Sequence, residues 1–302
     1  MVRKVASIVC LAFLTIGLAY VAAYLVASTQ NADEMAWNPG WLPWITFPML
    51  IIGAAATYVL WFPGCWHITL KELRTYFASP IAYAVMVAIF GISNLIFWWT
   101  LKGMMTQPGQ NEIAMTTMTT CFLLVLITPL LTMRLIAEEK RSGTYEILVT
   151  RPIHDLQMVV GKFMGAMGVM LVIIAVTFLQ PLMAELGGNP DWGPIWSAYV
   201  GLIGWTAAFV AIGVFASALT ASQIAAAAIA WFMTIMMWLL SALRSVDPGK
   251  AISKLGEYMS PNAVMEEFAR GTIDTTRLIY VASLTIFFLF AAWMTLFSGR
   301  SR

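Results

Sequence analysis

The chain has 302 residues, of which 60% are hydrophobic and 11% are charged, with a formal net charge of +2. Soluble globular domains are normally about one quarter charged, so this composition excludes an ordinary soluble protein and gives no sign of a nucleic-acid partner. The three cysteines show neither metal-ligand spacing nor a pair suited to an extracellular disulfide.

Eight apolar runs are long enough to cross a hydrocarbon core about 30 Å thick as helices. Helices are expected because backbone polar groups in lipid must pair within their own segment, and the alternation typical of barrel strands is absent. The sequence therefore predicts an all-α polytopic membrane protein. The predicted spans are Val5–Ala27, Leu42–Phe62, Ile81–Leu101, Ile113–Ala137, Met158–Ala184, Pro194–Leu219, Ile224–Leu243 and Leu278–Phe297.

The first run follows Arg3 and Lys4 and ends in small residues, so a cleaved signal peptide is the alternative to a retained helix. We expect retention because the apolar stretch is longer than a usual signal core. Cleavage would leave the other seven predicted spans in place.

An amphipathic helix is predicted after the second span, over residues 66–79. Its apolar stripe consists of Trp66, Leu70, Leu73 and Phe77. The opposite side carries His67, Lys71, Arg74 and Thr75. Such a helix is expected to lie in the cytosolic headgroup layer, with its cations toward lipid phosphate or a partner.

The most polar cytosolic stretch is Arg134–Pro152. Pro129 permits a kink before it, and we expect the fourth span to continue as a helix to about Glu139. Gly143 and Thr144 should end that helix, with a second short helix at Tyr145–Val149. The result would be a helix–turn–helix that presents Glu138, Glu139 and Glu146 to a soluble partner.

The later elements include a tight hairpin and an external segment. Thr220–Ser222 joins the sixth and seventh spans, whose many small residues are expected to face other helices. Two short amphipathic helices are predicted within Arg244–Arg277, the first around Ile252–Met259. The second should open with Ser260 as N-cap and Pro261 at N1 and close at Gly271.

Loop charges give the orientation. With a cytosolic amino terminus, eleven of the seventeen Lys and Arg residues fall on the cytosolic side, so both termini are predicted to be cytosolic. The expected divisions are an amino-terminal helix pair (1–62), an amphipathic helix (63–80) and a core (81–302). The core contains the polar segment 134–152 and the external segment 244–277.

The absent chemistry narrows the function. Ionisable residues are missing from the middle of every predicted span, since Arg134 and Lys162 fall near cytosolic ends, and this disfavours a secondary carrier. Gly161-Lys162 lacks the rest of a P-loop, and no nucleophile–base pair is evident, so the chain is not expected to be an enzyme. Asn94 and Gln180 are expected to bond between helices.

Several stretches resemble the permeases of the ABC-2 transporter superfamily, most closely those associated with gliding motility. A-E-E-K-R-S-G-T-Y-E (Ala137–Glu146) is similar to their coupling loop, and K-E-L-R-T-Y-F-A-S-P-I-A-Y (Lys71–Tyr83) to their elbow helix and first core span. Further matches are Arg151–Phe163, Ser217–Ile224 and Ser260–Asp274. The implied coupling residues are Glu138, Glu139, Arg141, Gly143, Thr144 and Glu146. The implied elbow residues are Trp66, Lys71, Glu72, Arg74 and Phe77.

The resemblance, which covers roughly residues 66–300, implies a six-helix core to which the first two spans are extra. It further implies a permease, expected to be an exporter in a bacterial inner membrane, that pairs with a second permease subunit. Cytosolic ATP-binding subunits, which hold ATP and Mg²⁺, would attach at the coupling loop, and an auxiliary periplasmic subunit is allowed. This chain would hold no cofactor. The alternatives are a scaffold that recruits cytosolic partners without transport and, third, a secondary carrier.

Overall fold

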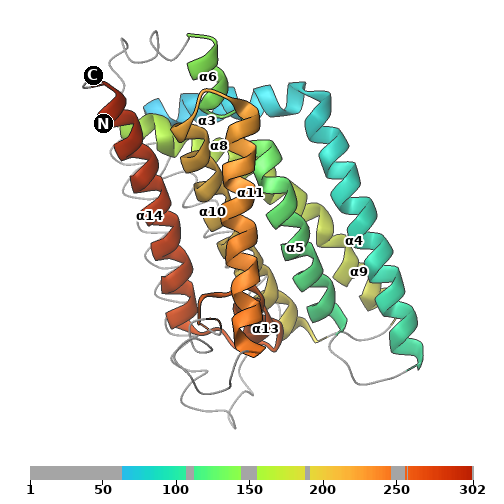
Figure 1. The fold of residues 1–302 in the computed structure, drawn as a ribbon. Helices are drawn as coiled ribbons and strands as arrows, with labels where there is room; N and C mark the ends of the chain where they lie inside the picture. The colour runs from blue at the N-terminus through green and yellow to red at the C-terminus, as the bar shows by residue number, and fades with distance from the viewer. Residues whose placement is uncertain are drawn as a thin grey trace, which may run out of the picture. The chain divides into compact units, whose positions relative to one another are not determined.

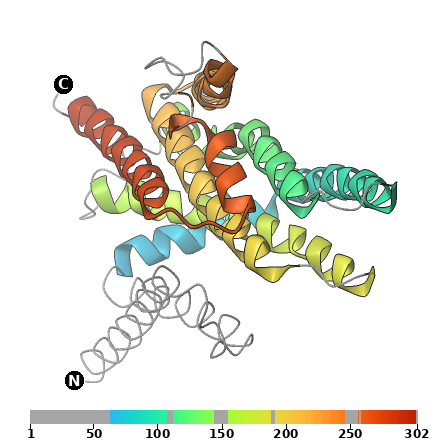
Figure 2. The ribbon, with the colours of Figure 1, turned by 90° about the horizontal axis from the view of Figure 1, so that it is seen from below.

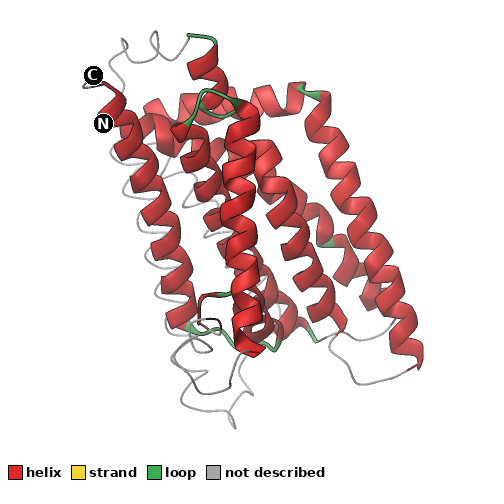
Figure 3. Ribbon diagram, viewed as in Figure 1, coloured by secondary structure: helices red, strands yellow, loops and turns green. Residues whose placement is uncertain are grey.

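A computed structural model describes residues 63–106, 112–143, 155–187, 191–245, 256 and 258–300. Every regular element in these ranges is a helix (Figure 3). The chain divides into two compact units, residues 1–67 and 68–302, and the helices below belong to the second apart from the first residues of α3. The predicted spans Val5–Ala27 and Leu42–Phe62 lie outside the described residues.

The helices follow one another with short connections. They are α3 (Pro63–Ala78), α4 (Pro80–Thr106), α5 (Glu112–Thr132), α6 (Ala137–Arg141), α8 (Asp155–Thr177), α9 (Leu179–Gly187), α10 (Trp192–Leu219), α11 (Gln223–Leu239), the 3₁₀ helix η2 (Leu240–Ser245), α13 (Pro261–Ala269) and α14 (Thr275–Arg300).

Six segments of the described chain are long and apolar enough to cross a membrane, and they confirm the last six predicted spans. They are Tyr83–Thr100, Thr116–Arg141, Asp155–Glu185, Trp192–Leu219, Gln223–Ala242 and Thr275–Ser298. Successive segments alternate in direction (Figure 1). As a result α3, α6, the α10–α11 turn and the last turn of α14 lie at one end of the bundle, called here the α6 end. The opposite end, with α13, is called the α13 end.

Helix α10 occupies the centre of the bundle and packs against α5, α8, α11, α13 and α14 (Figure 2). It is apolar on all sides, as a helix surrounded by other helices should be, and Trp205 and Phe209 stack at its middle. Gly213 lets α5 approach so closely that a Cβ added there would lie 2.1 Å from Thr132 Oγ1. The predicted burial of small residues is confirmed along α10, whereas on α11 only one face, with Ala226, Ala227 and Ala230, is buried.

Two predicted spans are interrupted. The fifth divides at Phe178 into α8 and α9. The physical reason is Pro181, which lacks an N–H for the carbonyl of Thr177 and whose ring collides with that carbonyl in a regular helix. The fourth ends at Thr132, so its predicted continuation to Glu139 is wrong: α6 is a separate short helix.

The two uncharged polar side chains expected to bond between helices do otherwise. Asn94 donates to the carbonyl of Phe90 in its own helix, at 2.8 Å. The side-chain nitrogen of Gln180, buried at the start of α9, has no hydrogen-bond partner within the described residues.

The α13 end confirms one predicted external helix. Ser260 caps α13 through a bond from the N–H of Ala263, and Gly271 ends the segment with a φ of 87°. Arg277, which is buried, forms two hydrogen bonds with the carboxylate of Glu267 and so fixes α13 to the start of α14. Most of the other predicted external helix, including Ile252 and Leu255, lies outside the described residues.

Candidate functional site

The α6 end contains an interruption between α5 and α6 at residues 133–136. Hydroxyls weaken the helix before it, because Thr128 and Thr132 donate to the carbonyls of Leu124 and Thr128, four residues back in each case. The N–H of Leu135 then bonds to Thr132 at 3.1 Å, three residues back, which tightens the turn. The chain consequently leaves the α5 axis before α6 starts.

Ser217 of α10 completes this interruption. In a continuous helix the amides of Ile136 and Ala137 would bond to the carbonyls of residues 132 and 133. Instead both donate to Ser217 Oγ, each at 3.0 Å, while that hydroxyl donates to the carbonyl of Met133 at 3.0 Å. One buried side chain therefore satisfies three backbone groups that the interruption exposes.

Two other carbonyls near the interruption also accept from side chains of other helices. Tyr76 of α3 donates to Leu131 at 2.6 Å, and Lys162 of α8 donates to Leu135 at 2.6 Å. The connection between α5 and α6 is thus held by α3, α8 and α10 together.

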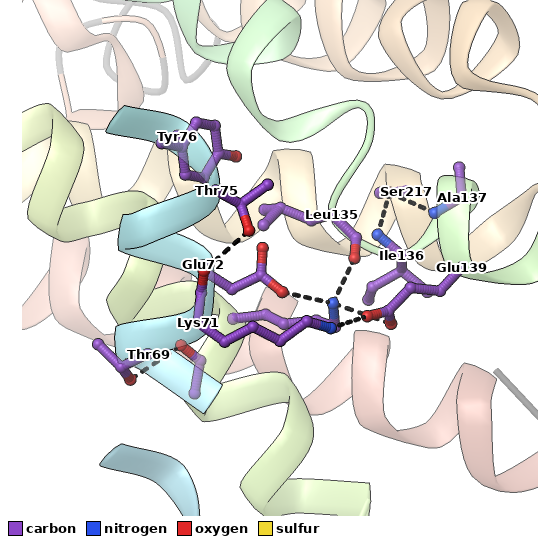
Figure 4. A network of polar contacts seen from close by, with 12 residues as sticks. Thr69, Lys71, Glu72, Thr75, Tyr76, Leu135, Ile136, Ala137, Glu139 and Ser217 are labelled. Atoms are coloured by element: carbon purple, nitrogen blue, oxygen red, sulfur yellow. Dashed lines mark hydrogen bonds and ion pairs between the residues drawn. The ribbon is translucent and has the colours of Figure 1, made fainter. Parts of the chain in front are cut away.

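Lys162 is the centre of a buried ion cluster, called here the Lys162 cluster and made of Lys71, Glu72, Glu139 and Lys162. Its ammonium lies 3.0 Å from Glu72 Oε1 and 2.9 Å from Glu139 Oε2. Lys71 Nζ lies 3.1 Å from the other oxygen of Glu139. The bonds meet between α3, α6 and the interruption (Figure 4). Formal charges cancel in the cluster, as burial requires, because an unpaired buried charge is very costly.

Close packing of α3 on α8 brings the acid to the lysine. A Cβ added at Gly165 would lie 2.6 Å from Glu72 Cβ, so only glycine permits this approach. One turn earlier, Thr69 Oγ1 donates to the carbonyl of Gly161 at 3.1 Å. These contacts place Glu72 over the α8 surface from which Lys162 projects.

Tyr76 and Arg134 form a second contact between α3 and the interruption. The Arg134 guanidinium lies 4.8 Å from the centre of the Tyr76 ring, a cation–π distance. Burial of Tyr76, with a smaller effect of the Glu72 charge, raises the pKa of its hydroxyl well above the ordinary value. The hydroxyl therefore stays protonated and can donate to Leu131.

Helix α6 ends as the sequence predicts. Gly143 has a φ of 70°, a left-handed conformation that favours glycine, and its N–H bonds to the carbonyl of Lys140. Lys140 itself donates to the carbonyl of Ala218 at the end of α10. Glu138 and Arg141 are exposed on the remaining surface of the helix.

The structure separates the predicted coupling residues into inward and outward groups. Glu138, Arg141 and Gly143 are exposed, but the Glu139 side chain is only 13% exposed and is directed at Lys162 rather than presented outward. Thr144, Glu146 and the predicted helix Tyr145–Val149 lie outside the described residues.

The elbow residues divide in the same way. Lys71 and Arg74 are exposed, as predicted, and Phe77 is half-buried with its ring edge against Tyr83. The most buried positions of α3 beyond residue 67 are Thr69, Glu72 and Tyr76, so a partly polar stripe faces the other helices. Trp66 lies near the start of α3 in the first unit.

Sequence reasoning missed the roles of Lys162, Ser217 and Tyr76. Lys162 follows the start of α8 by seven residues, about 10 Å along the axis, which reads as an exposed helix end. One signal was present: Gly161 and Gly165 flank the lysine at spacings that let another helix approach closely. Among the described residues no group of three or more His, Cys, Asp and Glu could hold a metal ion.

Comparison with known families then connects this geometry to a class of protein. The chain matches the family described as ABC-2 family transporter protein over residues 1–299. It belongs to the ABC-2 transporter family. ABC-2 permeases are multi-pass membrane subunits without a nucleotide-binding site of their own, in agreement with the apolar helices observed.

The ABC-2 match is broader than the resemblance seen in the sequence. It starts at residue 1 and so includes the two predicted spans that were counted as extra to the six-helix core. The gliding-motility subfamily is not resolved by this match. A search of curated proteins found no significant match.

Proposed function

We propose that the chain is the membrane permease subunit of an ABC exporter driven by separate cytosolic ATP-binding subunits. The observation that carries this proposal is the family match over residues 1–299. Six candidate spans and a small charged helix at one end support it, because a permease needs a membrane path and a contact for its ATPase. ATP and Mg²⁺ belong to the partner subunits in this proposal, and this chain binds no cofactor.

The proposal puts the α6 end and both termini in the cytosol, with the chain in a bacterial inner membrane. Exposed Lys71, Arg74 and Arg141 support this orientation, because cytosolic loops carry an excess of Lys and Arg.

The partner ATPase is expected to contact the outward side of α6. Glu138 and Arg141 are exposed there, whereas the carboxylate of Glu139 is already paired with Lys162 and Lys71. Exposed charges at an interface chiefly set orientation and association rate. Glu138 and Arg141 are therefore the residues we expect to fix how the ATPase docks.

A second permease subunit, identical or related, completes the transport path in this proposal. Large exposed apolar side chains support contacts with lipid and with that subunit, for example Trp99 on α4, Ile224 on α11 and Ile286 on α14. An auxiliary periplasmic subunit would meet the α13 end.

The experiment is co-expression of the full chain with an ABC ATP-binding subunit from the same organism, followed by affinity capture and reconstitution in lipid nanodiscs. We expect the two to co-purify and ATP hydrolysis to depend on the permease. Glu138→Lys combined with Arg141→Glu should weaken capture, while the matched charge exchange Glu266→Lys with Arg270→Glu at the α13 end should not.

Two outcomes would contradict this function. A folded chain that captures no ATP-binding subunit would remove the proposed partner. Capture without any effect on ATP hydrolysis or on its nucleotide dependence would instead favour the scaffold alternative.

A further inference from the structure

We propose that Lys162 is the positioning residue through which movement of α6 reaches the transmembrane helices, because it fixes α6 to α8. This inference rests on the proposed function and names the path that ATP-driven movement takes inside the permease.

The direct path along the chain is interrupted. An unbroken helix would carry a displacement of α6 straight into α5, but residues 133–136 are not α-helical. The two amides that would continue the α5 hydrogen-bond pattern, those of Ile136 and Ala137, bond to α10 instead. The covalent connection is therefore a flexible joint rather than a rigid rod.

Lys162 supplies a stiff connection at the same place. All three protons of its ammonium are used, by Glu72, Glu139 and the carbonyl of Leu135. The side chain is 1% exposed, so water cannot replace a partner that moves away. Separation of α6 from α8 would leave buried charges unpaired, and the two helices should move together.

A competing connection runs from α6 to α10 through Ser217 and through Lys140, which donates to Ala218. The Ser217 bonds are neutral, whereas hydrogen bonds between ionised groups are about twice as strong. Lys140 is only partly buried, so water can substitute for its carbonyl partner. These differences favour α8 over α10 as the helix that follows α6.

The test measures hydrogen–deuterium exchange in the complex of the full chain with its ATP-binding subunit, with and without ATP. In the parent, we expect ATP to change exchange in the peptide of α6 and in the first turns of α8. In Lys162→Met, the α6 response should remain and the α8 response should fall about fivefold or more, the lower end of coupling between sites. Lys162→Arg should restore part of it.

Three further variants separate this role from general stabilisation. Ser217→Ala should leave the α8 response intact, and so should Arg270→Gln, which removes an exposed ion pair at the α13 end. If Lys162→Met does not fold, Glu139→Gln weakens the same connection from the α6 side and should lower the α8 response.

An α8 response that persists in Lys162→Met or Glu139→Gln, or one that is lost in Ser217→Ala alone, would overturn the inference. So would a parent complex in which ATP changes α6 but not α8. Failure of the parent to bind an ATP-binding subunit would be a different result, because it would contradict the proposed function itself.

Discussion

At the scale of residues, the α6 end depends on a few polar side chains that each satisfy several partners. Lys162 uses all three protons and Ser217 Oγ takes part in three bonds. Each group lies where water is excluded, so removal of either leaves more than one partner unsatisfied.

Lys162→Met should strongly destabilise the protein, because it leaves Glu72 and Glu139 close together without the shared cation. Removing one partner of a buried ion pair typically costs about 3–5 kcal/mol. Lys71→Met, which removes the 59% exposed lysine of the same cluster, should cost at most about 1 kcal/mol. Thermal unfolding in detergent, followed by tryptophan fluorescence, measures both; equal shifts would contradict the buried geometry.

Ser217→Ala should loosen the interruption itself. The amides of Ile136 and Ala137 lose their acceptor, and a lost buried hydrogen bond of about 1.4 kcal/mol raises exchange about tenfold. Hydrogen exchange of the peptide spanning residues 133–141 reports this change. Ser222→Ala, at the exposed cap of α11, is the matched control and should leave that peptide unaffected; unchanged exchange in Ser217→Ala would show that the bonds are not formed.

Residue types alone did not reveal these roles. A lysine two turns into an apolar helix and a serine at a helix end are both ordinary at a membrane boundary. Their partners are distant in sequence, since Glu72 and Lys162 are 90 residues apart and Ser217 and Ile136 are 81 apart. Such pairings depend on how helices pack, which periodicity does not determine.

At the scale of elements, the close contact of α3 with α8 holds Glu72 in place. Gly165→Ala should push α3 away, since the new Cβ would overlap the Glu72 side chain, at a cost of about 1–3 kcal/mol. Gly91→Ala is the control, because a Cβ there meets nothing within 4 Å and alanine favours a helix. Melting temperatures in detergent should fall for the first and hold or rise for the second; the reverse order would contradict the packing.

Gly143→Val tests the end of α6 and, with it, the turn predicted to act in coupling. The left-handed φ of 70° disfavours a β-branched residue by about 1–3 kcal/mol, although the space around Gly143 is open. Gly143→Asn tolerates that conformation and serves as control. We expect valine to lower permease-dependent ATP hydrolysis and asparagine to retain it, with normal membrane insertion in both. Parental hydrolysis in the valine variant would exclude a role for this turn.

Helix positions were predictable and helix interruptions were not. Apolar runs located six described spans, and Ser260 with Pro261 located the start of α13. The interruption at 133–136 has no glycine or proline within it, and its stability comes from Tyr76, Lys162 and Ser217 on other helices. Pro181 was a local signal for the interruption at Phe178, but apolarity continues across it.

At the scale of the whole molecule, the alternation of the six segments places α6 and α13 at opposite ends (Figure 1). Loop charge predicted the same arrangement, because it depends only on the number of spans between two loops. Charge distribution could not show how the ends are built, since Arg277 and Lys162 are buried and paired within the bundle.

Single cysteines at Arg141 and Ile273 test this topology in a chain whose native cysteines are replaced by alanine. We expect Arg141→Cys to react with a membrane-impermeant thiol reagent only after the cells are opened. Ile273→Cys should react from outside in intact spheroplasts. Labelling of both positions from the same side would contradict the alternation.

The interruption before α6 also bears on how the chain is made. Residues 133–136 leave the ribosome well before Lys162 and Ser217, the side chains that satisfy their carbonyls and amides. During synthesis this short stretch must rely on water or the insertion machinery until α8 and then α10 arrive. Assembly of the cytosolic contact is therefore a late event in biogenesis, and a nascent chain that stops before α10 cannot complete it.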